Sequence, residues 1–297
     1  MTKPPNVRVP QPEGTLLPAD EALANWMLSR IRERPPEPLP ATPPLAVERF
    51  WPAPVAPVPV PGCRIESCHP ALAEDLPGVE TIRIGRSPRG ARRGRPSRLR
   101  SRKGGRVLRL TSGLEFDHAL DGELDGSVER MVEQPIWLRF VTSERARRHR
   151  PDLLLVRAAG WEFTEVKFEE EAAEPENEAR WPVIGAALNC LGYSYRVVTE
   201  RHIRHPVRHA TVWRIFEDRH TPTPAPDVLW PLLRGLGGGE GRTLAQMRLI
   251  LPTLTREQAH ALVRQGVLAV DLNQPVGDGM RFSRGREEPS LTQYSED

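Results

Sequence analysis

Cysteine is scarce in this chain of 297 residues: it has three, Cys63, Cys68 and Cys190, so any disulfide scheme leaves one thiol unpaired. No second pair of ligands follows Cys63, Cys68 and His69 at zinc-finger spacing, so we expect reduced thiols without metal. The sequence also lacks an uncharged apolar run near the roughly 18 residues of a membrane-spanning helix, and a secretory leader. These absences exclude a transmembrane protein and favour a reducing, cytoplasmic compartment.

Proline is distributed unevenly, because 16 of the 32 prolines fall in the first 62 residues. A segment so rich in proline lacks the backbone donors and the apolar periodicity of a packed domain. We therefore expect residues 1–82 to form a flexible extension. Within it, the apolar residues of Asp20–Arg34 recur at helical spacing, which predicts one short amphipathic helix that packs on its own protein or docks on a partner.

The net charge of +3 conceals a strong asymmetry. The segment Arg83–Arg109 holds 12 Lys and Arg and no acidic residue, so the remainder of the chain carries a net charge of −9. A basic block beside a folded domain favours the phosphate backbone of nucleic acid as partner, with a solubilising tail as the alternative. The residues expected to bind DNA are Arg92, Arg93, Arg95, Arg98, Arg100, Arg102, Lys103 and Arg106.

Regular elements are expected from Val107 onward. Ser112 can cap a helix that runs to about Leu120, and a later helix has Pro182 in its first turn and ends at Gly192. Strands are expected over Pro135–Val141, Asp152–Arg157, Trp161–Lys167 and Ser194–Thr199. Residues 83–219 are therefore predicted to form an α/β domain with a mixed sheet flanked by helices.

The C-terminal third has a different pattern. Residues 220–227 have linker composition, and the pairs Thr243/Gln246 and Thr255/Gln258 match the capping box that begins a helix. A strand, a turn and a returning strand follow. This pattern predicts a winged-helix domain over residues 220–286, followed by a disordered tail over residues 287–297.

Two of the expected strands form a hairpin that brings acidic and basic side chains together. An antiparallel pair centred on Ala159 places Asp152 opposite Val166. Because side chains alternate along a strand, Glu165 and Lys167 share the face opposite to that of Val166. The hairpin therefore predicts that two carboxylates and one ammonium group meet at one edge of the sheet.

This trio has a definite chemical use. Asp152 and Glu165 offer the hard oxygen ligands that suit Mg²⁺, and Lys167 is placed to orient a water for attack on a phosphodiester. The strings Pro151-Asp152 and Glu165-Val166-Lys167 spell the PD-(D/E)xK nuclease signature. Alone, this signature has little specificity, because such spacing also arises in ordinary surface ion pairs.

Further motifs stand in a fixed order around the signature. They are Ser101–Arg106 (SRKGGR), Ser112–Glu115 (SGLE), Glu133–Pro135 (EQP), Arg150–Asp152 (RPD), Glu165–Lys167 (EVK) and Leu191–Glu200 (LGYSYRVVTE). Together they resemble the TnsA family, the endonuclease subunit of heteromeric transposases. The resemblance covers about residues 95–285 and departs from the family pattern after Glu115, where Phe-Asp-His follows.

The resemblance implies a restriction-endonuclease-like fold and a Mg²⁺-dependent DNA endonuclease, with Mn²⁺ as a possible substitute. It implies a metal held by Asp152, Glu165 and the carbonyl of Val166, with Glu115 as a third carboxylate that acts partly through water. It also implies cleavage of the 5′ (non-transferred) strands at the ends of a mobile element in the bacterial cytoplasm, at the nucleoid. The implied partners are a DDE-type transposase subunit and an ATP-dependent regulator that contacts the winged-helix domain.

Two other functions stay open at this point. One is a stand-alone PD-(D/E)xK nuclease of restriction or repair type, which would cleave DNA without partners. The other is a non-catalytic DNA-binding adaptor that keeps the fold, for which replacement of Lys167 would have no effect on DNA processing.

Overall fold

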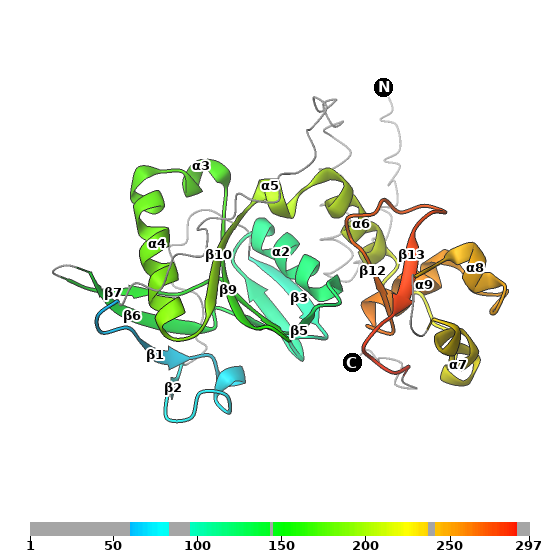
Figure 1. Cartoon of the computed structure of the whole chain (residues 1–297), viewed down its shortest axis with the longest axis horizontal. Coiled ribbons are helices and arrows are strands. Elements are labelled where there is room, and N and C mark those ends of the chain that lie inside the picture. Colours follow the sequence, from blue (N-terminus) through cyan, green and yellow to red (C-terminus); the bar gives the residue numbers. More distant parts are fainter. Residues whose placement is uncertain (1–59, 83–95, 143–144, 237–240, 290–297) are drawn as a thin grey trace, which may run out of the picture. The chain divides into compact units, whose positions relative to one another are not determined.

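The computed structural model describes residues 60–82, 96–142, 145–236 and 241–289 (Figure 1). Two sets of predictions lie outside these ranges: the helix expected over Asp20–Arg34 and the DNA contacts of Arg92, Arg93 and Arg95. The described part is a mixed α/β protein with several sheets, as expected. No helix in the described ranges is both long and apolar enough to cross a membrane.

The central sheet has the strand order β10–β9–β8–β5. Its strands are β5 (Val128–Glu133), β8 (Leu153–Arg157), β9 (Gly160–Lys167) and β10 (Ser194–Thr199). β9 pairs antiparallel with β8 and parallel with β10, so the sheet is mixed. The expected strands over the β8–β9 hairpin and β10 are therefore confirmed.

The register of the β8–β9 hairpin differs from the expected one by one residue. Leu153 lies opposite Thr164 and Arg157 opposite Gly160, so the turn is centred between Ala158 and Ala159. A two-residue connection is the commonest way to close a hairpin, whereas the sequence reading assumed a three-residue turn. Asp152 is therefore in line with Glu165, although its carboxylate still reaches the backbone of the following residue.

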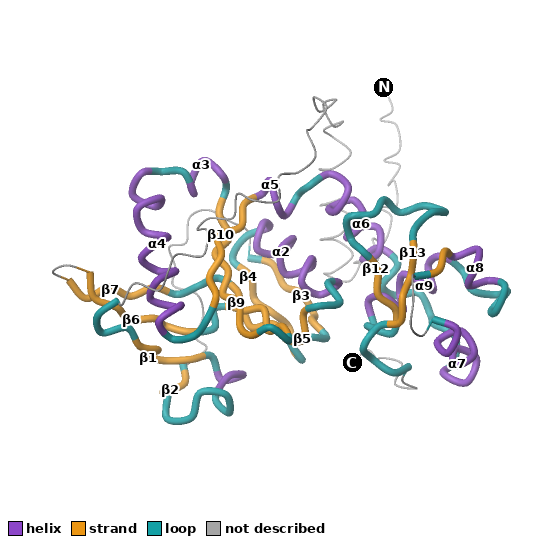
Figure 2. The backbone as a smooth tube through the Cα atoms, viewed as in Figure 1, coloured by secondary structure: helices purple, strands orange, loops and turns teal. Residues whose placement is uncertain are grey.

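A second sheet has the order β2–β1–β6–β7. Its strands are β1 (Arg64–Cys68), β2 (Glu80–Thr81), β6 (Ile136–Thr142) and β7 (Arg145–His149), and the short helix η1 (Pro70–Leu72) follows β1. β6 and β7 form a hairpin that extends past α4 (Pro175–Cys190) in Figure 2, and β7 is an edge strand.

The structure corrects the expected start of the folded part. Residues 64–81 were assigned to a flexible extension, but β1 pairs with β6, and Cys68 and Leu72 are fully buried. Proline density ends at residue 61, and the short strand Arg-Ile-Glu-Ser-Cys has too little apolar periodicity to stand out in the sequence. The folded part therefore begins well before residue 83.

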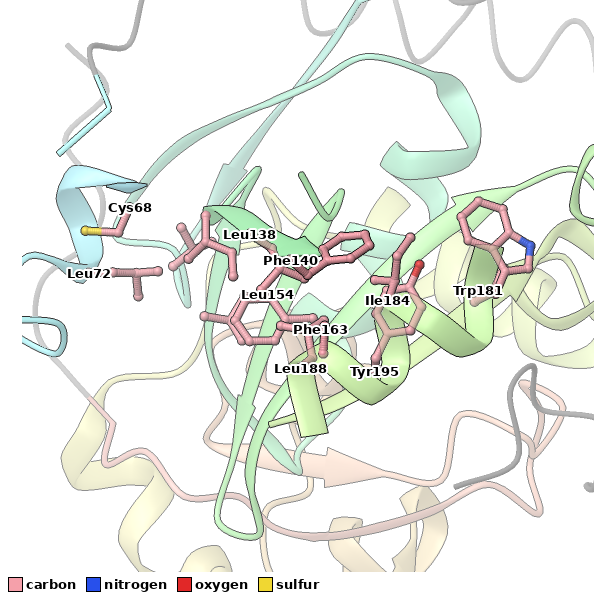
Figure 3. Packing of buried hydrophobic residues seen from close by; sticks show 14 of the residues in the cluster. Cys68, Leu72, Leu138, Phe140, Leu154, Phe163, Trp181, Ile184, Leu188 and Tyr195 are labelled. Atoms are coloured by element: carbon pink, nitrogen blue, oxygen red, sulfur yellow. The ribbon is translucent and has the colours of Figure 1, made fainter. Parts of the chain in front are cut away.

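A large apolar core lies where the two sheets and α4 meet (Figure 3). It includes Cys68, Leu72, Leu138, Phe140, Leu154, Phe163, Trp181, Ile184, Leu188 and Tyr195. Val166 and Val198 point to the other face of the central sheet, where they pack with Leu114 and Ile203. Alternation along β9 thus places Phe163 and Glu165 on the core side and Val166 on the opposite side.

Helix α2 (Gly113–Leu124) begins at Ser112, whose hydroxyl accepts a hydrogen bond from the Glu115 amide as expected of an N-cap. It continues four residues beyond the expected end at Leu120. Gly122 explains the difference: a methyl group there would lie 2.7 Å from Met131 Sδ and 3.2 Å from Leu155 Cδ2. This glycine therefore allows the helix to pack closely on the sheet and does not break it.

Helix α4 begins at Pro175, seven residues before the expected start near Pro182. Two prolines compete for the first helical turn, and the one at residue 175 occupies it because the acidic segment before Pro182 is itself helical. Gly192, with a φ of 83°, follows the end of the helix as expected.

A second hairpin and three helices complete the part of the described chain that precedes α7. The hairpin of β3 (Ser97–Ser101) and β4 (Arg106–Leu110) precedes α2, and α3 (Glu169–Ala172), α5 (Glu200–Ile203) and α6 (Pro206–Glu217) join or follow the strands of the central sheet. Glu123 of α2 binds the hairpin, accepting hydrogen bonds from Ser101 Oγ (2.6 Å) and the Arg102 amide (2.9 Å).

The C-terminal elements are α7 (Pro226–Gly235), β11 (Arg242–Thr243), α8 (Leu244–Arg248), α9 (Arg256–Arg264), β12 (Leu268–Val270) and β13 (Arg281–Arg284). The three strands form a sheet of order β11–β13–β12. Both predicted capping boxes are present, because Thr243 and Thr255 exchange hydrogen bonds with Gln246 and Gln258. The strand, turn and returning strand expected after α9 are confirmed.

Candidate active site

The predicted trio of Asp152, Glu165 and Lys167 does come together. Asp152 immediately precedes β8, and the other two residues lie at the end of β9. Lys167 Nζ lies 3.0 Å from Glu165 Oε1 and 3.7 Å from Asp152 Oδ2, and it donates a hydrogen bond to the carbonyl of Val166 at 3.3 Å. The three oxygens predicted to bind magnesium are therefore the three that surround this ammonium group.

Backbone hydrogen bonds hold Asp152 in place. Its Oδ2 accepts from the Val166 amide at 2.8 Å, and its own amide donates to the Thr164 carbonyl at 3.1 Å. Its carbonyl accepts from the amide of Gln134 at 2.8 Å, in the turn between β5 and β6. Gln134 has a φ of 44°, the one positive value of a non-glycine residue within the described ranges, so this turn holds a strained backbone conformation beside the trio.

Glu165 has a second neighbour that the sequence did not predict. It is 5% exposed, and its Oε2 lies 3.0 Å from Nε2 of His149 on β7, although the two atoms are not aligned as a hydrogen bond. Arg180 of α4 contacts the other ring nitrogen of His149, with 2.9 Å between Nη2 and Nδ1. Because arginine has only donors, Nδ1 accepts, and the ring proton of His149 lies on the nitrogen next to Glu165.

Tyr195 of β10 also borders this site. It is buried, its ring packs edge-on against His149 with 6.2 Å between centroids, and its hydroxyl has no hydrogen-bond partner among the described residues. Burial raises the pKa of Tyr195 well above its usual value, and the charges of Glu165 and Asp152 raise it further. The hydroxyl therefore stays protonated beside the two carboxylates.

The two carboxyl groups differ in pKa because their neighbours differ. Burial raises the pKa of Asp152 well above its usual value, and the charge of Glu165 adds to this effect, against the attraction of Lys167. Burial also pushes the pKa of Glu165 upward, but His149 and Lys167 together outweigh it and lower the pKa. The pair therefore favours one proton on Asp152 and one negative charge on Glu165, opposite the charged Lys167.

Glu115 lies apart from the trio. Its carboxylate is used in the first turn of α2, where it accepts hydrogen bonds from Thr111 Oγ1, from the Thr111 amide (2.8 Å) and from Ser112 Oγ (3.2 Å). Its charge nevertheless contributes to the raised pKa of Asp152, so the two carboxylates are close enough to interact electrostatically. The structure does not bring Glu115 into hydrogen-bond contact with the trio.

The donor set suits a magnesium ion in its chemistry. Within the described ranges, no group of three His, Cys, Asp or Glu side chains is arranged to hold a metal. Asp152, Glu165 and the Val166 carbonyl nevertheless converge on one cation, the Lys167 ammonium, and carboxylate and carbonyl oxygens are the ligands that Mg²⁺ prefers. Glu165 Oε2 also lacks a hydrogen-bond donor. These residues therefore fit a divalent cation, provided that Lys167 gives up its position.

Of the residues predicted to contact DNA, five are described. Arg98 and Arg100 are exposed on the outer face of β3. Arg102 pairs with Glu287 at 2.9 Å, and Arg106 pairs with Glu133. The guanidinium groups of Arg102 and Arg106 therefore bind acidic side chains of this chain, Glu287 and Glu133.

Lys103 departs most clearly from its prediction. It is buried, and its ammonium group donates hydrogen bonds to the carbonyls of Gly122 (2.9 Å) and Asp125 (2.5 Å) at the end of α2. Burial lowers the pKa of Lys103 to about 8. Since the ammonium group donates to these carbonyls, Lys103 stabilises the C-terminus of the helix and does not face a phosphate backbone.

His149, Arg180 and Tyr195 were missed by sequence reasoning for a common reason. Each reaches the trio from a different element, and none belongs to the PD-(D/E)xK signature, although Tyr195 lies within the Leu191–Glu200 motif. The sequence does place His149 two residues before the Pro151-Asp152 string, at the end of an arginine-rich segment. That signal identifies a residue close to Asp152 but not its contact with Glu165.

No protein-family model and no curated protein sequence matches this chain. The resemblance of its ordered motifs to the TnsA family therefore stays a prediction.

Proposed function

We propose that this protein is a magnesium-dependent DNA endonuclease. The observation that carries the proposal is the convergence of Asp152, Glu165 and the Val166 carbonyl on the ammonium group of Lys167, at the end of a β-hairpin. An ordinary surface ion pair would not bury Glu165 almost completely or place a histidine, itself in contact with Arg180, behind it. Burial of charged groups costs desolvation free energy, and such buried charges are typical of catalytic sites.

In this proposal, a bound Mg²⁺ supplies a polarised water and stabilises charge on the scissile phosphate. Asp152 and Glu165 would hold the ion together with the Val166 carbonyl. Asp152 would bind it as the carboxylate, with its proton released to solvent, and the backbone amide of Val166 would keep that carboxylate oriented. His149 and Arg180 fix the orientation of Glu165. Lys167, released from the three oxygens, orients the attacking water or the phosphate.

Glu115 enters the proposal as a carboxylate that acts from a distance. It is close enough to Asp152 to interact electrostatically, and its present partners are groups of the first turn of α2. A contact to the ion that is made partly through water is the role that the family resemblance assigns to it.

The motifs favour one setting for this nuclease. We propose that the elements from β3 to α6 form a restriction-endonuclease-like domain and that α7 to β13 form a winged-helix domain. By resemblance to the TnsA family, the protein would cut the 5′ strands at the ends of a mobile element. A DDE-type subunit would cut and join the 3′ ends, and the winged-helix domain would contact an ATP-dependent regulator.

The test is strand-specific nicking of labelled element-end DNA with Mg²⁺. Wild type and Asp152→Ala are compared, each with and without the cognate DDE subunit. We expect cleavage of the 5′ strand that needs the partner and disappears in the variant. Cleavage by the protein alone would instead indicate a stand-alone nuclease of restriction or repair type. No cleavage under any condition, with DNA binding retained, would indicate a non-catalytic adaptor and overturn the proposal.

A further inference from the structure

Strand β7 carries arginines of two distinct kinds. Side chains alternate along the strand, so Arg145, Arg147 and His149 share one face, and Arg148 lies on the other. The register with β6 places Arg147 opposite Phe140 and His149 opposite Leu138. The first face is therefore buried at its His149 end, and it is exposed at Arg145 and Arg147.

The arginines of the two faces have different surroundings. Arg148 lies 2.6 Å from Glu66, and its guanidinium stacks on the ring of Trp137, 4.7 Å from the centroid. Thr142 Oγ1 donates a hydrogen bond to the Arg145 carbonyl at 3.4 Å, but in the described part of the chain no ion pair or hydrogen bond engages the guanidinium group of Arg145 or Arg147. The Arg145/Arg147 pair, called the β7 arginine pair below, thus presents positive charge that the described acidic residues do not neutralise.

The β7 arginine pair leads directly to the candidate active site. His149, on the same face, has Nε2 3.0 Å from Glu165 Oε2. Residues two apart on a strand are separated by about 6.7 Å, so the pair extends from roughly 7 to roughly 13 Å beyond His149. A linear polyanion that followed this face would arrive at the carboxylates of the site.

We propose that the β7 arginine pair binds consecutive backbone phosphates of the DNA strand that enters the site. Three properties support a phosphodiester backbone as the occupant. The pair is cationic without a described acidic partner, guanidinium groups bind phosphate through two parallel hydrogen bonds, and the row ends at groups suited to phosphodiester hydrolysis. The inference deepens the proposed nuclease function and adds a DNA contact that the basic segment before α2 does not include.

The first test measures binding by the full-length chain without divalent metal. The probe is a fluorescent DNA duplex, titrated at several salt concentrations in EDTA. The variant Arg145→Gln/Arg147→Gln is compared with Arg148→Gln, which removes from the other face of the same strand a charge that is paired with Glu66 and stacked on Trp137. We expect the double variant to bind at least about 10-fold more weakly at about 0.1 M salt, and its plot of log K against log salt to lose a slope of about 2. The Arg148→Gln variant keeps the wild-type slope.

The second test locates the contact on the DNA. Duplexes that each carry one neutral methylphosphonate linkage are bound by wild type and by the double variant. In wild type, we expect two or three adjacent linkages of the cut strand to weaken binding. In the double variant, the same linkages no longer have an effect, because the arginines that contact those phosphates are gone. Identical profiles for the two proteins, or an unchanged salt slope, would overturn the inference.

Nicking assays separate this inference from the proposed nuclease function. If wild type nicks DNA and the double variant raises KM with kcat retained, both stand. If wild type nicks and the double variant binds and nicks equally well, the arginine pair fails alone. If wild type never nicks DNA but the double variant binds DNA more weakly than wild type, the DNA contact stands and the nuclease function fails.

Discussion

Lys167 Nζ lies 3.0 Å from Glu165 Oε1 and thus occupies the centre of the oxygens that we propose as metal ligands. Burial alone would lower the pKa of Lys167, but the charges of Glu165 and Asp152 outweigh it and raise the pKa. The lysine therefore stays charged and balances the site when no divalent cation is bound. Lysine and cation compete for the same oxygens, and this competition can be measured.

Lys167→Met tests this competition through stability as well as activity. Without the ammonium group, Glu165 is left buried beside Asp152 with less positive charge, so the melting temperature in EDTA should fall. A divalent cation then replaces the missing charge. We expect Mg²⁺ to raise the melting temperature of Lys167→Met more than that of wild type, while nicking falls about 10²- to 10⁴-fold. An equal Mg²⁺ response in both proteins would contradict the competition, and retained nicking would contradict a catalytic role.

Asp152→Asn should separate stability from function. The pKa of Asp152 is raised in the folded protein, so the folded state keeps its proton above pH 4, where the unfolded state loses it. Ionisation of Asp152 therefore costs stability as pH rises from about 4 towards the folded pKa. Asparagine removes this cost and can still accept the hydrogen bond of the Val166 amide. We expect its melting temperature at pH 7 to exceed that of wild type by about 2–6 °C, without nicking activity.

The control for this variant is the pH dependence itself. At pH 4 the two proteins should melt at similar temperatures, because Asp152 is then protonated in wild type. A difference that stays constant between pH 4 and pH 7 would show that the variant acts through packing and not through the carboxyl charge. The same series for Glu165→Gln should show the opposite sign, because the pKa of Glu165 is lowered.

Local patterns predicted the part of the site that lies on one hairpin. The β8–β9 strands, the Asp152, Glu165 and Lys167 trio and both capping boxes follow from alternation and from side chains a few residues apart. These signals depend on neighbouring residues alone. They could be identified without knowledge of how distant segments pack.

Contacts between distant segments could not be predicted in this way. His149 reaches Glu165 from a strand of the other sheet, and β1 pairs with β6 across more than 60 residues of sequence. Lys103 lies in a basic segment whose composition indicates a DNA contact. Its ammonium group instead donates hydrogen bonds to backbone carbonyls at the end of α2. In each case tertiary packing decides which residues are in contact, and the composition of a segment does not predict those contacts.

His118→Gln tests a buried neutral histidine in α2. Burial lowers the pKa of His118 to about 3, with nearby arginines adding to the effect, and its Nε2 lies 3.0 Å from Thr164 Oγ1. The unfolded state takes up a proton below about pH 6.5, whereas the folded state does so near pH 3, so folding stability is lost as pH falls through this window. Glutamine cannot titrate. Between pH 7 and pH 3, the free energy of unfolding of wild type should fall on the order of 4 kcal/mol more than that of His118→Gln, measured by urea unfolding. An equal fall in both proteins would contradict a buried neutral His118.

Gly122→Ala tests the close contact between α2 and the central sheet. In an exposed helix this change stabilises by about 0.5–1 kcal/mol, because alanine loses less conformational entropy. Here the methyl group would lie 2.7 Å from Met131 Sδ and 3.2 Å from Leu155 Cδ2, so overpacking should decide the sign. We expect a destabilisation of about 1–3 kcal/mol in urea unfolding. Gly113→Ala in the same helix is the control, since its nearest neighbour would be Arg204 Nη2 at 4.0 Å. Met131 is fully buried, so Met131→Ala is itself destabilising, but Gly122→Ala should cost less in the Met131→Ala background than in wild type if the sulfur causes the clash. A stabilising Gly122→Ala would refute the close packing.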